Sequence, residues 1–218
     1  MSRVSRPLKL LFFVLLVRPL VLIVLGLNIV NRNKLPTQGP AIIAANHNSH
    51  LDTMVLMSLM PLRVLHKVRP VAAADYFLKN RWRAWFSLNA IGIIPLARRG
   101  RMDRETLFEG CRSALANGDI LILFPEGSRG KAEQMQPLKR GLFHLASAEP
   151  DVPVIPVVMH GLGRALPKGD PILVPFNCDV AIGDPLPLSE DGKEFITAVE
   201  EAFQRQLNEC LTWGNTGA

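Results

Sequence analysis

A histidine and an aspartate stand five positions apart in the segment Asn46-His47-Asn48-Ser49-His50-Leu51-Asp52. The apolar runs on either side predict a strand before the segment and a helix after it, so His47 falls in the loop and Asp52 in the first helical turn. An aspartate that orients one ring nitrogen of a histidine leaves the other nitrogen to take a proton from a hydroxyl. The pair is therefore a candidate general base. A structural hydrogen bond that caps the helix explains the same two residues equally well.

The same segment raises a third interpretation, metal binding by His47, His50 and Asp52. It is similar to the H-x-H-x-D-H pattern of metallohydrolases, but the first spacing is one residue longer and Thr53 stands where a ligand is expected. The other histidines are scattered along the chain: His66, His144 and His160. We therefore expect no metal site.

A second segment, Phe124-Pro125-Glu126-Gly127-Ser128-Arg129, follows an apolar strand predicted over residues 120–124. Loops at the carboxyl ends of strands bind ligands in α/β sheets. Arg129 would grip a phosphate with two hydrogen bonds, Gly127 would let the backbone approach the ligand, and Glu126 would accept a hydrogen bond from a hydroxyl. Standing alone, the segment would also suit a polar turn with a surface arginine.

Two further segments complete the set. In Gly92-Ile93-Ile94-Pro95-Leu96-Ala97-Arg98 a strand delivers Arg98 to its end, close to Arg99 and Arg101. An anion site and a solvated basic turn account for this pattern equally. The segment Val152-Pro153-Val154-Ile155-Pro156-Val157-Val158 predicts a buried strand whose prolines shape one wall of the site, beside an acyl chain.

The elements that must position these residues alternate between short apolar runs and longer amphipathic stretches. The predicted strands cover residues 40–45, 68–74, 91–96, 120–124, 154–158, 172–174 and 178–182. The predicted helices cover residues 52–60, 76–90, 104–116, 139–148 and 194–211. This alternation predicts one α/β domain over residues 35–218, with a mostly parallel or mixed central sheet flanked by helices.

The first 34 residues predict a membrane anchor. The run from Leu8 to Val30 is almost wholly apolar but is interrupted by Arg18 and Pro19, which predicts two short helices, about 8–17 and 20–31, with a break between them. Each is too short to span a bilayer, so a re-entrant or interfacial (monotopic) anchor is favoured over a single span or a signal peptide. Its basic flanks favour the cytoplasmic face of the inner membrane.

Composition narrows the class of partner. The chain of 218 residues carries a net charge of +6, which suits an anionic partner such as nucleic acid, an acidic membrane surface or a phosphorylated substrate. Aromatic residues make up 6% and no nucleic-acid fingerprint is present, so we expect no nucleic acid. The three cysteines are far apart and suggest neither a zinc site nor a disulfide framework.

Taken together, these motifs make the chain resemble the 1-acylglycerol-3-phosphate acyltransferase family, part of the wider glycerophospholipid acyltransferases. Four family blocks occur in the family's order: N-H-x4-D at 46–52, G-x5-R at 92–98, F-P-E-G-[ST]-R at 124–129 and V-P-[IV]-[IV]-P-V at 152–157. Together they span about half of the chain. Ala97 stands where many members carry aspartate, and Ser128 replaces the commoner threonine.

The resemblance implies an α/β acyltransferase in which His47 and Asp52 are catalytic. It implies that Arg98, the loop Glu126 to Arg129 and Lys139 bind the substrate. The acyl donor would be acyl-CoA or an acyl carrier protein thioester, and the acceptor the sn-2 hydroxyl of 1-acylglycerol 3-phosphate, which gives phosphatidic acid without any cofactor. Relatives with these blocks also acylate other lysolipids, so another lysolipid acceptor is one alternative. A non-catalytic peripheral membrane scaffold is the other.

Overall fold

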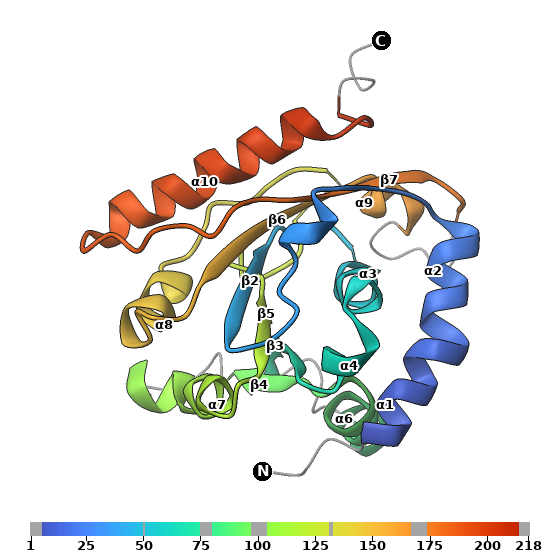
Figure 1. Ribbon diagram of the computed structural model, residues 1–218, viewed down its shortest axis with the longest axis horizontal. Coiled ribbons are helices and arrows are strands. Elements are labelled where there is room, and N and C mark those ends of the chain that lie inside the picture. Colours follow the sequence, from blue (N-terminus) through green and yellow to red (C-terminus); the bar gives the residue numbers. More distant parts are fainter. Residues whose placement is uncertain are drawn as a thin grey trace.

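Seven strands form one mixed sheet at the centre of the protein, seen here in a computed structural model (Figure 1). The structure describes residues 6–49, 51–74, 80–96, 104–130, 133–166 and 174–213. Across the sheet the strands are β1 (Gly26–Val30), β7 (Asn177–Ile182), β6 (Val154–His160), β2 (Ala41–Ala45), β5 (Ile120–Leu123), β3 (Val68–Ala73) and β4 (Ile94–Leu96). All neighbours pair in parallel except β6 and β7.

The central strands β2 and β5 are apolar at every position because the sheet is covered on both faces. In β2, Ile43 and Ala45 point into one core cluster, and Ile42 and Ala44 into the other. All five residues of β2 are buried. The chain leaves β2 directly into the segment with His47, so the general-base candidate sits at the carboxyl end of a rigid central strand.

Helices cover each face of this sheet (Figure 1). The N-terminal helix, α3, α4 and α9 pack on one face, while α7, α8 and α10 pack on the other. The bounds on the first face are α1 (Arg6–Phe12), η1 (Phe13–Val17), α2 (Arg18–Val24), α3 (Leu51–Leu59), α4 (Leu62–Leu65) and α9 (Leu162–Ala165). Those on the second face are α7 (Arg104–Ala116), α8 (Gly141–Ala148) and α10 (Gly192–Glu209). Three further elements are η2 (Arg32–Lys34), α6 (Arg81–Phe86) and η3 (Ser87–Ile91).

The α/β class and the mixed central sheet are confirmed, and most predicted elements agree with the structure to within a few residues. The helix predicted over 76–90 is present from Arg81 as α6 and continues as the π-helical segment η3. Residues 75–79 and the strand predicted at 172–173 lie outside the described residues. Residue 174, the last of that strand, is not in a strand.

The N-terminal segment departs from the prediction in two ways. First, the helix runs without a break from Arg6 to Val24, because the π-helical turn η1 absorbs the backbone mismatch before Pro19. Second, the predicted second helix to residue 31 is wrong, since the helix ends at Val24 and Gly26–Val30 forms β1. A short apolar run suits helix or strand equally, and pairing with β7 decided between them.

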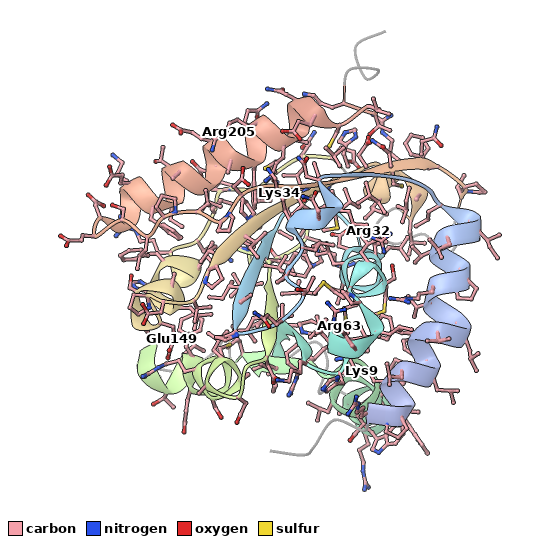
Figure 2. The ribbon with its side chains drawn as sticks, viewed as in Figure 1. Lys9, Arg32, Lys34, Arg63, Glu149 and Arg205 are labelled. Carbon is pink, nitrogen blue, oxygen red and sulfur yellow. The ribbon has the colours of Figure 1, made fainter. Side chains whose placement is uncertain are left out.

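This strand shows that the sheet begins before the predicted domain boundary at residue 34. Among the described residues, Arg6–Val24 is one helix long and apolar enough, by length and composition, to cross a membrane. Its two interior charges turn toward the sheet domain. Lys9 Nζ donates to the Val68 carbonyl, and Arg18 Nη2 donates to the Met60 carbonyl over 2.6 Å. Figure 2 shows Lys9 at the lower end of this helix.

Candidate active site

The histidine and aspartate of the first motif are in direct contact. His47 Nδ1 lies 2.9 Å from Asp52 Oδ2, and the ring of His47 borders a cavity while the carboxylate of Asp52 is buried. A regular helix would place residues five apart on different faces, but the bend from loop to helix brings these two together. With Nδ1–H donating to Asp52, Nε2 is the ring nitrogen that carries the lone pair.

Asp52 also shapes the loop that holds the histidine. Its Oδ2 accepts hydrogen bonds from the backbone N–H groups of Asn48, over 2.7 Å, and Ser49, over 2.8 Å. These donors precede α3, so the carboxylate fixes the loop that enters the helix as well as orienting the imidazole, and its position in the first turn suits the helix dipole. The structural and the catalytic interpretations of the sequence are therefore compatible, because one oxygen does both.

Phe124 stacks against one face of the His47 ring. The two rings are stacked with centroids 4.1 Å apart and an interplanar angle of 19°. Phe124 follows β5, the strand next to β2, so the first and the F-P-E-G-S-R motifs meet because their strands are neighbours. The stacking and the contact with Asp52 together restrict the orientation of the imidazole ring.

Glu126 lies under the loops rather than at their surface. It is 1% exposed, and its two carboxylate oxygens accept from the backbone N–H of His47, over 2.7 Å, and of Gln136, over 2.9 Å. Burial raises the pKa of the Glu126 carboxyl, while the two backbone hydrogen bonds oppose that rise. The expected hydrogen bond from a substrate hydroxyl to this carboxylate stays a prediction, and the hydrogen bonds seen come from backbone N–H groups.

Asn46 connects the loop that carries His47 to strand β6. Its amide makes two hydrogen bonds to the backbone of Met159, accepting from its N–H over 2.7 Å and donating to its carbonyl over 2.8 Å. Asn48 Nδ2 donates to the same carbonyl over 2.9 Å. Met159 lies in β6, so the loop is anchored to β6 on one side and, through Glu126, to the end of β5 on the other.

A cavity of about 600 Å³ opens beside His47. One end is polar and includes Ser128, Arg129 and Lys139. The remaining walls are mainly apolar and come from β3, β4, β5, η3, α3, α7 and α8. Their side chains include those of Val71, Ile93, Phe108 and Leu142. A volume of this size suits a ligand with a long apolar part. The β6 prolines, expected to form a wall beside an acyl chain, do not line it.

The F-P-E-G-S-R loop and Lys139 form the polar end together. Gly127 has φ of +71°, a conformation that side chains rarely adopt, and a Cβ there would come within 2.7 Å of Lys139 Nζ. Lys139 N–H also donates to the Pro125 carbonyl over 2.8 Å. The glycine thus lets the ammonium group of Lys139 lie against the loop.

Most of the residues singled out from the sequence gather at this cavity. Those that line it are His47, Gly127, Ser128, Arg129 and Lys139, with Asp52 and Glu126 directly behind His47. Arg98 lies outside the described residues, as does His50. Within the described part of the chain no group of three His, Cys, Asp or Glu side chains is arranged to hold a metal ion.

One half-buried acidic residue, Glu133, was missed by sequence reasoning. Glu133 accepts from the backbone N–H groups of Gly161, over 3.0 Å, and Gly163, over 2.9 Å, and its Oε2 lies 3.5 Å from Asn48 Nδ2. Its φ of +57° is uncommon for a residue with a side chain. No local pattern marks this position, because its partners come from distant segments.

Fold and site together define an α/β protein in which a histidine–aspartate pair and cationic side chains share one largely apolar cavity. The comparison with known families then identifies the chain: a family model for acyltransferases matches residues 26–160, more than half of its length. The chain belongs to the acyltransferase family.

Curated relatives carry more specific names. The chain is 28% identical over 153 residues to 1-acyl-sn-glycerol-3-phosphate acyltransferase alpha of Homo sapiens, covering 70% of this chain and 52% of the relative. It is 29% identical over 135 residues to the chloroplastic 1-acyl-sn-glycerol-3-phosphate acyltransferase BAT2 of Brassica napus, covering 60% of this chain and 36% of the relative. The matched region thus spans about half of the length of the human relative and about a third of that of the Brassica relative.

A solved structure supports the fold. The crystal structure of the 1-acyl-sn-glycerophosphate acyltransferase PlsC from Thermotoga maritima is similar with a TM-score of 0.74, covering 94% of this chain and 82% of that one. The sequences are 20% identical, so this likeness speaks for the fold alone.

Proposed function

We propose that this protein transfers a fatty acyl group from a thioester to the sn-2 hydroxyl of 1-acylglycerol 3-phosphate, which gives phosphatidic acid. The observation that carries the proposal is the shared cavity. An oriented imidazole, two cationic side chains and an apolar chamber of about 600 Å³ occupy one site. A lysophospholipid and a fatty acyl thioester both combine a long apolar chain with an anionic head. The names of the curated relatives agree with this choice.

In the proposed reaction His47 is the general base. Its Nε2 removes the proton of the acceptor hydroxyl as that oxygen attacks the thioester carbonyl, while Asp52 stabilises the imidazolium that forms. The tetrahedral intermediate then collapses, the carbon–sulfur bond breaks and the imidazolium returns its proton to the thiolate that leaves. An ester and a free thiol result, so atoms and charge balance without a metal or a bound cofactor.

The acceptor phosphate would bind at the polar end of the cavity. Lys139 and Arg129 line that end, and the family resemblance adds Arg98. Two guanidinium groups and one ammonium group would neutralise a phosphate monoester and hold the glycerol backbone near His47. The apolar walls would take an acyl chain. The donor is either acyl-CoA or an acyl carrier protein thioester, since both present the same phosphopantetheine sulfur.

We further propose that the N-terminal helix rests in one leaflet as a monotopic anchor, with the catalytic domain on the cytoplasmic face of the inner membrane. The support is the inward turn of Lys9 and Arg18, which bind backbone carbonyls of the sheet domain. Because two charged side chains of the helix bind carbonyls of its own domain, the helix packs along that domain. A helix packed in this way is poorly placed to cross a bilayer alone.

The test is an acyl-transfer assay with the full-length chain reconstituted in liposomes. Palmitoyl-CoA and a palmitoyl acyl carrier protein are each offered with a panel of lysophospholipids, beside the variant His47→Ala and the control His66→Ala. His66 does not line the cavity, so its variant should keep activity. We expect phosphatidic acid from 1-acylglycerol 3-phosphate and a loss of about 10²–10⁴-fold in His47→Ala.

Other outcomes would redirect the proposal. Acylation of a different lysolipid, equally dependent on His47, would keep the chemistry and change the acceptor. The absence of product with every donor and acceptor pair, in a protein that is folded and bound to the liposomes, would favour the non-catalytic membrane scaffold.

A further inference from the structure

Large exposed hydrophobic side chains are concentrated on two elements, the N-terminal helix of the first face and the short helix α6. The outward side of the N-terminal helix exposes aliphatic residues, namely Leu11, Val14, Leu15, Leu16, Leu20, Leu22 and Ile23. The short helix α6 exposes Trp82 at 81%, Trp85 at 53% and Phe86 at 37%. Large aromatic side chains left this open to water are unusual unless they have a partner.

These two groups form one continuous surface, here called the apolar face. Phe12 of α1 meets Phe86 of α6 edge to face, with ring centroids 5.0 Å apart. The segment η3, which continues α6, packs against α1. Figure 1 likewise shows α6 beside α1. Trp82 and Trp85 are three residues apart and so share one side of α6.

The chemistry of the apolar face fits a lipid leaflet. The charged residues within the helix point away from it, because Lys9 and Arg18 donate to carbonyls of the sheet domain. Exposed arginines stand at the margin, at Arg6, the first residue of α1, and at Arg81, next to Trp82 in α6. Apolar surface bordered by tryptophan and basic residues is the pattern of a protein that rests at the boundary of headgroups and acyl chains.

We propose that Trp82 and Trp85 of α6 insert into the same leaflet as the outward side of Arg6–Val24, as a second membrane contact. The proposal goes beyond the proposed reaction, since it holds for any lysolipid acceptor. It also places the bilayer next to the cavity, because η3 leads from α6 to Ile91 and Ile93, which line the cavity wall. An amphiphilic substrate could then enter sideways from the leaflet.

The experiment uses tryptophan fluorescence in the full-length chain. The sequence has three tryptophans, so Trp213→Phe leaves Trp82 and Trp85 as the reporters. The protein is reconstituted in vesicles of phosphatidylcholine and phosphatidylglycerol, with or without bromine on the acyl chains. We expect a several-fold loss of emission with the brominated lipid, and protection of the same emission from acrylamide.

A matched control places one tryptophan elsewhere. In a chain with all three tryptophans changed to phenylalanine, Leu188→Trp creates a reporter at an exposed apolar site two residues from Leu186, which packs against the opposite core cluster. Brominated lipid should leave that emission unchanged while acrylamide quenches it.

Two results would overturn the proposal. One is unchanged emission from Trp82 and Trp85 in brominated vesicles to which the protein is bound. The other is protection from acrylamide without quenching by bromine, together with a dimer mass in detergent, which would assign the apolar face to a second copy of the chain. Acyl transfer by the Trp213→Phe protein is measured separately, so failure of the reaction and failure of this inference are distinguishable.

Discussion

Asp52 Oδ2 binds His47 Nδ1 at 2.9 Å and, at the same time, accepts the backbone N–H groups of Asn48 and Ser49. One carboxylate oxygen therefore sets both the shape of the loop and the orientation of the imidazole it carries. A change at Asp52 should thus disturb catalysis even where the loop survives.

Asp52→Asn tests this relationship. An amide oxygen in the place of Oδ2 can keep all three contacts, but the neutral side chain no longer stabilises the imidazolium that forms when Nε2 takes a proton. Nε2 is then a much weaker base. We expect kcat to fall by about 10²–10⁴-fold with little change in either KM, measured by steady-state assay. An unchanged kcat in the folded variant would contradict the role of His47 as base.

Glu126→Gln tests the support of the histidine loop. Glutamine has a single acceptor oxygen, so its NH₂ group would oppose the N–H of either His47 or Gln136. Leaving a buried donor unsatisfied costs about 1–3 kcal/mol. We expect a lower melting temperature and a kcat about 10-fold or more below that of the parent protein. Glu190→Gln, an exposed site with the same change of charge, should leave both values unaltered.

Lys139→Ala tests the phosphate end of the cavity. A charge-assisted hydrogen bond to phosphate is worth about 1.5–3 kcal/mol, and solvent at this exposed side chain reduces that value. We expect KM for 1-acylglycerol 3-phosphate to rise by about 10-fold while KM for the thioester stays nearly constant. The neighbouring Arg140→Ala removes a charge of the same sign outside the cavity lining and should leave both constants unchanged. Equal effects in the two variants would point to general surface charge instead.

Asn46→Ala tests the tie between β2 and β6. The substitution removes two hydrogen bonds to the Met159 backbone at a site that is 2% exposed. An unsatisfied buried group costs about 1–3 kcal/mol, and each kcal/mol shifts Tm by about 2–4 °C in a chain of this size. A fall in Tm of roughly 2–12 °C is expected by calorimetry or circular dichroism. Asn208→Ala, on the exposed side of α10, should change Tm very little.

Much of the architecture was accessible from the sequence because it depends on local pattern. The continuous apolar run of β2 and the amphipathic period of α10 can be recognised in the sequence. The bounds of both elements were predicted within two or three residues. The contact of His47 with Asp52 was also accessible, since the two residues are five apart and joined by a loop that enters a helix. The same local logic failed at Gly26–Val30, where a short apolar run became a strand only because β7 lay beside it.

Tertiary structure alone decided the rest of the site. Glu126 reaches the backbone of His47 across 79 residues of sequence, and Asn46 reaches Met159 across 113, because the order β6-β2-β5 makes those strands neighbours. The shape of the cavity depends likewise on how β3, α7 and α8 pack around the strand ends. By itself the sequence determined which groups could do chemistry and which strands would carry them. Their partners depended on strand order and side-chain packing, which are properties of the whole sheet and carry no local signature.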